Sequence, residues 1–294
     1  FFTMTDTITS VVIPDTVTTI EEDAFMKCFG LTSVTIPDSV TSIGSYAFFR
    51  CTALTSVTLG EQTETIGSSA FYDCDALCEI QFGTSLKTIG DSAFYGCEKL
   101  KQVTFGEGAS SLGSLGAYAF AYSTLESIPF PADCPLATIG DSAFYNCRSL
   151  QEISLPCGLK EIRELAFGHC TKLARIDLPD SITTLGEYCF SGCSVLHSLK
   201  LPQGITELDT DIIYDSYGIR YLIIPSHVSL PSYLPDTLKK LNPYGHGRLV
   251  VHRGSDAYDD CLRKNIPCTL YEELPFCLGE LRVTSATDAQ LQQF

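Results

Sequence analysis

The sequence predicts an α/β repeat protein: a solenoid of stacked coils with one long parallel sheet and short helical turns on the other side. The first observation is a pattern of about 23 residues, seen in 31–53, whose apolar and glycine positions return at the same offsets along the chain. A fixed period of this length is typical of solenoids, in which each unit buries its apolar face against its neighbours. The second observation is one phenylalanine per unit, recurring as Phe25, Phe48, Phe71, Phe94, Phe120, Phe144, Phe167 and Phe190.

The first part of each unit has the pattern of a half-buried strand. In residues 31–53, the apolar side chains of Leu31, Val34 and Ile36 are interleaved with polar ones, so the two kinds would lie on opposite faces. The segment 37–39 (Pro-Asp-Ser) has turn chemistry and is expected to end the strand. Strands of stacked coils would then pair about 4.8 Å apart.

The second part of each unit is expected to return the chain to the core. Gly44 is expected to adopt a backbone conformation that other residues adopt only at a cost. Ser45 is expected to cap a single helical turn that carries Ala47 and Phe48 inward.

The motif L-x-x-V-x-I-P-x-x-V-T-x-I-G-x-x-A-F-x-x-C resembles the BspA-like leucine-rich repeats of bacterial and protozoan surface proteins. The resemblance covers nine units, from Ile8 to about Gly218. It implies a curved, right-handed solenoid that is used for binding, typically at a cell surface.

The repeats define three regions of the chain. Residues 1–7 are expected to form an N-terminal edge, and residues 8–225 a solenoid of about nine to ten repeats. Residues 226–294 are expected to form an irregular C-terminal cap and tail. Two adjacent units, from Leu100 and from Leu125, carry insertions that are expected to bulge after their strands. Such clustered insertions mark a binding face in some solenoids, but neutral drift explains them better.

The sequence of the C-terminal region predicts a strand, a helix and a second strand. Residues 249–251 are the first strand, and Ser255 is expected to cap a helix that ends at Lys264. Residues 268–271 are the last strand. The Gly-Ser-x-Ala-Tyr helix followed by Asn-Ile-Pro also resembles the segment that closes many BspA-like arrays, which implies that it covers the exposed edge of the sheet.

The charge of the chain excludes some classes of partner. With 19 basic and 35 acidic residues, the formal net charge is −16, so the chain would repel nucleic acids and anionic membranes. No apolar run approaches the length of a transmembrane helix, so no membrane insertion is expected. No secretory leader is visible, and a removed leader or a trimmed chain would look the same.

Half of the 14 cysteines fit the repeat rather than a disulfide framework. Seven of them share one repeat position and are expected to pack as reduced thiols in the core; we call them the thiol column: Cys28, Cys51, Cys74, Cys97, Cys147, Cys170 and Cys193. Cys134 and Cys157 are expected to occupy one turn position on neighbouring coils, outside the core. They could form a disulfide there or remain two unlinked surface thiols.

The sequence contains no recognisable catalytic or cofactor-binding motif, and neither an enzyme activity nor a cofactor is expected. Cys74 with Cys78, and Cys189 with Cys193, have spacings that zinc sites use, but one member of each pair belongs to the thiol column. The acidic segment 209–215 suggests calcium, and ordinary surface acidity explains it better.

Two surfaces are candidates for binding. One is a stripe directly after the repeat phenylalanine, Phe49, Tyr72, Tyr95 and Tyr145 with Met26 at its start, which is either an interface or a cover over the edge of the core. The other is the outward face of the sheet. Its candidate binding residues, here called the sheet face, are Glu79, Gln81, Gln102, Thr104, Glu152, Ser154, Arg175, Asp177 and Lys200.

Together these observations favour a non-enzymatic binding protein, secreted or at a cell surface as an adhesin, which engages protein or glycan along the solenoid. The absence of tryptophan weakens the glycan alternative. A second hypothesis is a spacer array that presents another domain. A third is an enzyme with its site in the irregular region 214–252.

Overall fold

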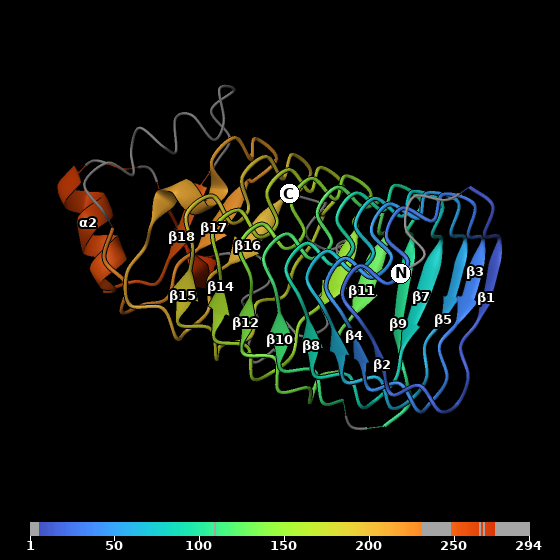
Figure 1. The fold of residues 1–294 in the computed structure, drawn as a ribbon. Coiled ribbons are helices and arrows are strands. Elements are labelled where there is room, and N and C mark those ends of the chain that lie inside the picture. Colours follow the sequence, from blue (N-terminus) through green and yellow to red (C-terminus); the bar gives the residue numbers. More distant parts are fainter. Residues whose placement is uncertain (1–5, 109, 231–247, 265, 267, 274–294) are drawn as a thin grey trace.

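The computed structural model describes residues 6–108, 110–230, 248–264, 266 and 268–273. It shows a parallel β-solenoid, as the repeat predicts. In Figure 1 the coils stack side by side, with β1 (Ser10–Val12) at one end and the helix α2 (Asp256–Lys264) at the other.

The first strand of each coil contributes to a parallel sheet along one face. Pairing is offset by one repeat, so that Val34 lies opposite both Val11 and Val57. The sheet has three hydrogen-bonded sections: β1, β3 (Ser33–Thr35) and β5 (Ser56–Thr58); β7 (Glu79–Phe82), β9 (Gln102–Phe105), β11 (Ser127–Pro129) and β13 (Glu152–Ser154); β16 (Ser198–Lys200), β17 (Tyr221–Ile223), β18 (Arg248–Val251) and β19 (Cys268–Leu270).

A second parallel sheet, which the sequence did not predict, runs along the coils. Each of its strands has two residues, one outward and one apolar, and this is too short for an alternating pattern to be recognised. The strands are β2 (Thr19–Ile20), β4 (Ser42–Ile43), β6 (Thr65–Ile66), β8 (Thr88–Ile89), β10 (Ser114–Leu115), β12 (Thr138–Ile139), β14 (Glu161–Ile162) and β15 (Thr184–Leu185).

The turns after the second sheet are not helical, which corrects the expectation for Ser45 to Phe48. Tyr46 and Arg50 both have φ of +57°, in the left-handed region, which breaks any helical run. The backbone N–H groups of Tyr46, Phe48 and Arg50 donate to carbonyls of the next coil at 2.7–2.9 Å. These bonds between coils alternate with local turn bonds, such as that from the N–H of Phe49 to the carbonyl of Tyr46 at 3.0 Å, so no helical run forms.

The repeat phenylalanines form one continuous stack through the core, which confirms the prediction. Successive rings are 5.1–5.7 Å apart between centroids, with interplanar angles of 3–13°. Such offset stacking adds to the stabilisation from burial. All of them from Phe48 to Phe190 are fully buried.

The repeat glycine is required for close approach between coils rather than for an unusual backbone conformation. Gly44 does not have a positive φ, which corrects the expectation for it. A Cβ added to Gly44 would lie 2.5 Å from the backbone nitrogen of Glu22 in the preceding coil. A side chain there would push two hydrogen-bonded coils apart.

Replacement of Gly67 by alanine is therefore expected to destabilise the fold by ~1–3 kcal/mol, the range for overpacking. Its Cβ would lie 2.6 Å from the nitrogen of Ser45, which is backbone and cannot rotate away. Chemical denaturation measures the effect. The matched control is Gly158→Ala, where an added Cβ meets nothing within 4 Å. Equal stability of the two variants would contradict this close packing.

The thiol column is buried, and no disulfide links its members, as predicted. In addition, the thiols of Cys51, Cys74, Cys97, Cys147, Cys170 and Cys193 each donate to a phenylalanine carbonyl of the preceding coil at 3.1–3.2 Å. Ser216 occupies the same repeat position and its hydroxyl donates to the carbonyl of Phe190. This repeat position therefore holds a small side chain that donates a hydrogen bond, and not merely a small apolar group.

The prediction that Cys134 lies outside the core is wrong. Cys134 is only 2% exposed, because a turn between Pro131 and Cys134 directs its side chain inward, whereas Ala132 and Asp133 within the turn are exposed. Cys157 is exposed, and both thiols are free in the structure.

The C-terminal strand, helix and strand form as predicted. β18 and β19 extend the first sheet in parallel beyond β17. The hydroxyl of Ser255 accepts a hydrogen bond from the N–H of Tyr258 at 3.1 Å, so Ser255 caps α2. The buried carboxylate of Asp260 accepts from the N–H of Leu230 at 2.8 Å and pairs with Arg263, which ties the helix to the last coil.

Candidate functional site

The sheet face forms a row of outward side chains on β7, β9 and β13. Glu79 pairs with Gln102, and Gln81 with Thr104, so these four side chains lie in two adjacent columns on the same face. The N–H and C=O groups beneath them are used by the sheet ladder, and the alternate residues are buried in the core. The face is therefore rigid, and only its side chains are available to a partner.

The remaining members of the sheet face are less continuous. Ser127 pairs with both Gln102 and Glu152, which brings Glu152 and Ser154 into the same section. Lys200 lies in the last section, on β16.

A break at residues 174–178 separates these two sections. The expected strand does not form there. Arg175 and Asp177 bind each other instead, with Nη2 to Oδ2 at 2.7 Å and Nε to Oδ1 at 3.2 Å. Two residues of the predicted surface are thus engaged with one another.

The stripe after the repeat phenylalanine is longer than the sequence predicts. Its rings form a chain of contacts with centroid distances of 4.6–5.6 Å. We call this row of rings the aromatic ribbon: Phe49, Tyr72, Tyr95, Tyr122, Tyr145 and His169. Tyr46 and Tyr118 lie against it, with centroid distances of 5.7 and 6.5 Å to Phe49 and Tyr95.

Two members of the aromatic ribbon, Tyr122 and His169, were missed at the level of the sequence. They stand one position later in the repeat than the other rings and follow small residues, Ala121 and Gly168. In the structure the ring of Tyr145 lies over Gly168, where an added Cβ would be 3.0 Å from Tyr145 Cδ2. A small residue followed by a ring at this position is the signal that would have revealed them.

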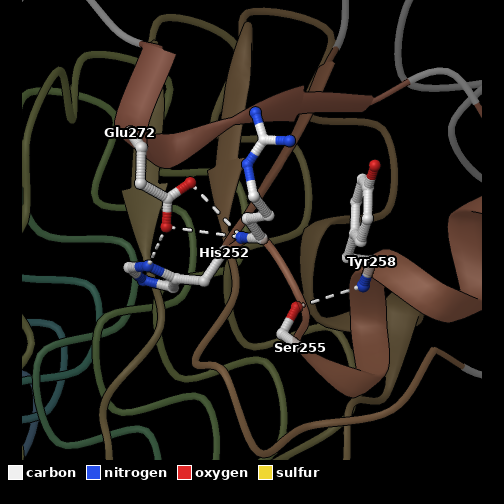
Figure 2. Close-up of polar contacts among 5 residues, drawn as sticks. His252, Ser255, Tyr258 and Glu272 are labelled. Atoms are coloured by element: carbon white, nitrogen blue, oxygen red, sulfur yellow. Dashed lines mark hydrogen bonds and ion pairs between the residues drawn. The ribbon is translucent and has the colours of Figure 1, made fainter.

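Of the region 214–252, which the third hypothesis gives as an enzyme site, residues 231–247 lie outside the described residues. Its last residue, His252, forms a hydrogen bond with Glu272 at the C-terminal cap. Figure 2 shows the carboxylate of Glu272 bonded to the ring of His252 and to the N–H of Arg253. His252 Nδ1 lies 3.2 Å from Glu272 Oε1, and its ring packs on Tyr271 at 4.6 Å. The nearby hydroxyl of Ser255 is used as the helix cap, so it does not form a nucleophile–base pair with His252.

The environment of Glu272 is that of an anchoring carboxylate. Partial burial by itself raises the pKa of Glu272, but its own backbone N–H, that of Arg253 and the ring of His252 outweigh burial and lower the pKa. A carboxylate with a lowered pKa stays charged at neutral pH and is suited to hold the cap rather than to transfer protons.

No metal site is formed by the described residues, in which no three His, Cys, Asp or Glu side chains are grouped to hold an ion. Cys74 is buried whereas Cys78 is exposed. In the acidic segment, Asp209 Oδ1 accepts from the N–H of Asp211 at 2.9 Å and caps the short 3₁₀ helix η1 (Thr210–Ile213).

The helices in the described part of the chain include none that is long and apolar enough to cross a membrane.

Comparison with known proteins agrees with this geometry. A family model of the BspA-type leucine-rich repeat region, with six copies, matches residues 1–115 and 113–234. None of the curated proteins compared with the chain matches it.

Among solved structures, a leucine-rich repeat protein from Bacteroides ovatus is similar in fold, with 23% identity over 85% of this chain and 83% of that chain and a TM-score of 0.55. A leucine-rich repeat protein of T. pallidum has 28% identity over 64% of this chain and 78% of that chain, with a TM-score of 0.49. A leucine-rich cell surface protein from Faecalibacterium prausnitzii has 22% identity over 83% of this chain and 85% of that chain, with a TM-score of 0.39. Because the family model spans most of the sequence, the chain belongs to the BspA-type leucine-rich repeat family.

Proposed function

We propose that this chain is a non-enzymatic binding protein, secreted or at a cell surface, which engages a protein or glycan partner through the sheet face. The observation that carries this proposal is a rigid row of exposed side chains on a sheet whose backbone groups are already paired. Membership of the BspA-type family supports it, since the repeats resemble those of surface proteins.

The chemistry of the described residues also favours binding over catalysis. The buried thiols have raised pKa values because of desolvation, so they are protonated and poor nucleophiles at neutral pH. The pair His252 and Glu272 lacks a hydroxyl or thiol nucleophile within its hydrogen bonds. These groups stabilise the fold and the cap.

An array of extracellular proteins and glycans, probed with the purified chain, tests this proposal. A specific hit is expected to lose at least tenfold in affinity with Glu79→Lys combined with Glu152→Lys, because both charges lie on the sheet face. The matched control is Glu107→Lys combined with Glu207→Lys, two exposed carboxylates outside that face.

Retained binding by the sheet-face variant would reject this surface. Silence across both arrays would reject the proposal in favour of a spacer array.

A further inference from the structure

The aromatic ribbon changes geometry half-way along its length. From Phe49 to Tyr95 the rings are stacked, with interplanar angles of 26° and 7°, and therefore cover one another's faces. From Tyr95 onward the successive angles are 49°, 63° and 86°, through Tyr122, Tyr145 and His169. The rings of this second half therefore no longer cover one another face to face. Tyr118 and Tyr122 are 43% and 41% exposed, close to the 39% of Tyr46 beside the stacked half, and Tyr145 and His169 are half-buried.

A column of carboxylates follows the same half of the ribbon. It consists of Asp91, Asp141, Glu164 and Glu187, which share the repeat position just before the first left-handed residue of each turn. No coil carries lysine or arginine at that position. The backbone carbonyls of Asp141, Glu164 and Glu187 accept hydrogen bonds from N–H groups of the preceding coil at 2.8–3.0 Å. The donor to Asp141 is the N–H of Tyr118.

These four carboxylates have no cationic partner. None of them forms an ion pair with any residue that the structure describes. The carboxylate of Asp91 accepts a hydrogen bond from the N–H of Ala117 at 2.8 Å. Together with the partly exposed rings of the same turns, the four carboxylates form an acidic, aromatic surface complementary to a cation, which the rings attract through their π-systems. The surface charge disfavours phosphate-bearing ligands for the same reason.

The other half of the ribbon shows how such a cation is held. Arg50 places Cζ 5.5 Å from the ring centroid of Phe49, and its Nε binds Asp73 Oδ2 at 3.1 Å. Within the described residues, Arg50 is the one cation that lies over a ring of the ribbon. The second half has rings, and acidic residues at the start of the same turns, without an arginine of the chain over the rings. Asp73 itself stands at the repeat position of Tyr122, five residues later than the carboxylate column.

We propose that Tyr118, Tyr122, Tyr145 and His169, with the carboxylate column, bind an extended arginine- or lysine-bearing segment of a partner protein. Its cationic side chains lie on the tilted rings and pair with the carboxylates, as Arg50 does with Phe49 and Asp73. The path from Tyr95 to His169 has three steps of 5.1–5.6 Å, which is roughly five residues of extended chain at 3.3 Å each. The inference rests on the proposed binding function but uses a different surface.

Fluorescence anisotropy with the complete chain and a labelled six-residue peptide of alternating arginine and serine tests the inference. The double variant Tyr118→Ser, Tyr122→Asn is expected to weaken binding at least fivefold. It is expected to fold, because neighbouring coils carry Ser142 and Asn146 at these positions, both also with left-handed backbone. The control is Tyr46→Ser, the same change at the same repeat position beside the stacked half.

A second pair of variants separates this site from general attraction to an acidic protein. Asp141→Asn with Glu164→Gln is expected to weaken binding at least fivefold, whereas Glu79→Gln with Glu152→Gln, which removes the same charge from the sheet face, leaves it unchanged. Equal weakening by both pairs, or equal binding of a peptide with glutamine in place of arginine, would overturn the inference. If the peptide binds to the aromatic ribbon but no protein or glycan on the arrays binds the chain, the sheet-face proposal is rejected and this inference is not.

Discussion

Replacement of Phe94 by alanine is expected to destabilise the chain by ~3–5 kcal/mol, the largest effect of any single truncation considered for this fold. The ring is fully buried and stacks between those of Phe71 and Phe120, at 5.2 Å from each and within 5° of parallel. Phe82 packs on its side at 5.8 Å. Hydrogen bonds fix the spacing of the neighbouring coils, so they cannot collapse into the cavity.

Thermal and chemical denaturation of Phe94→Ala measure this effect. The control is Tyr118→Ala, which removes an exposed ring from the same part of the solenoid. A melting temperature of Phe94→Ala within a degree of the parent would contradict the stacked core.

Alkaline pH is expected to destabilise the chain steeply through the thiol column. Burial raises the pKa values of Cys51, Cys147 and Cys193 from 9.0 to about 12. The folded state keeps these thiols protonated while the unfolded state loses their protons above pH 9. Their contribution is therefore complete below pH 9 and is lost as the pH rises toward 12. Each thiol contributes about 1.4 kcal/mol per pH unit, so the three together contribute roughly 4 kcal/mol per unit.

Urea denaturation at several pH values between 8 and 11 measures this slope. The matched control is the triple variant Cys51→Ser, Cys147→Ser, Cys193→Ser, since Ser216 already forms the equivalent hydrogen bond in the coil that begins with β16. Tyrosine and lysine titrate alike in both proteins, so the difference in slope isolates the thiols. The same slope for parent and variant would show that the thiols are not buried.

Features that repeat in every coil could be predicted from the sequence, because nine copies reinforce one pattern. The stacked column that contains Phe94, the burial of the cysteines such as Cys74 and the outward direction of Glu79 are examples. Each depends on burial, which the periodicity of apolar residues reports directly.

Features that depend on exact backbone geometry could not be predicted in this way. The residue types at positions 46 and 50 do not indicate the left-handed conformation of Tyr46 and Arg50, since tyrosine and arginine disfavour it. The close approach at Gly44 comes from the neighbouring coil rather than from the glycine's own turn. The inward position of Cys134 follows from an insertion that occurs once, so no repeated pattern reports it.

The candidate surfaces, too, were predictable where they follow the repeat and not where they depart from it. The sheet face followed from simple alternation, but the break at residues 174–178 did not, because Arg175, Ile176 and Asp177 keep the alternating pattern of the other strands. The aromatic ribbon was recognised only where its rings share one repeat position. Its tilted half, with Tyr122 and His169, required the structure.

Mapping of reactive cysteines in the native protein tests the central claim most directly: one closed core runs through all coils and leaves only the exterior for binding. With iodoacetamide near pH 8 and peptide mass spectrometry, Cys78 and Cys157 should be alkylated in the folded chain, because both are exposed. The thiol column from Cys51 to Cys193 should react only after denaturation. Alkylation of the column at the rate of Cys78, or cross-links between its members, would contradict the account.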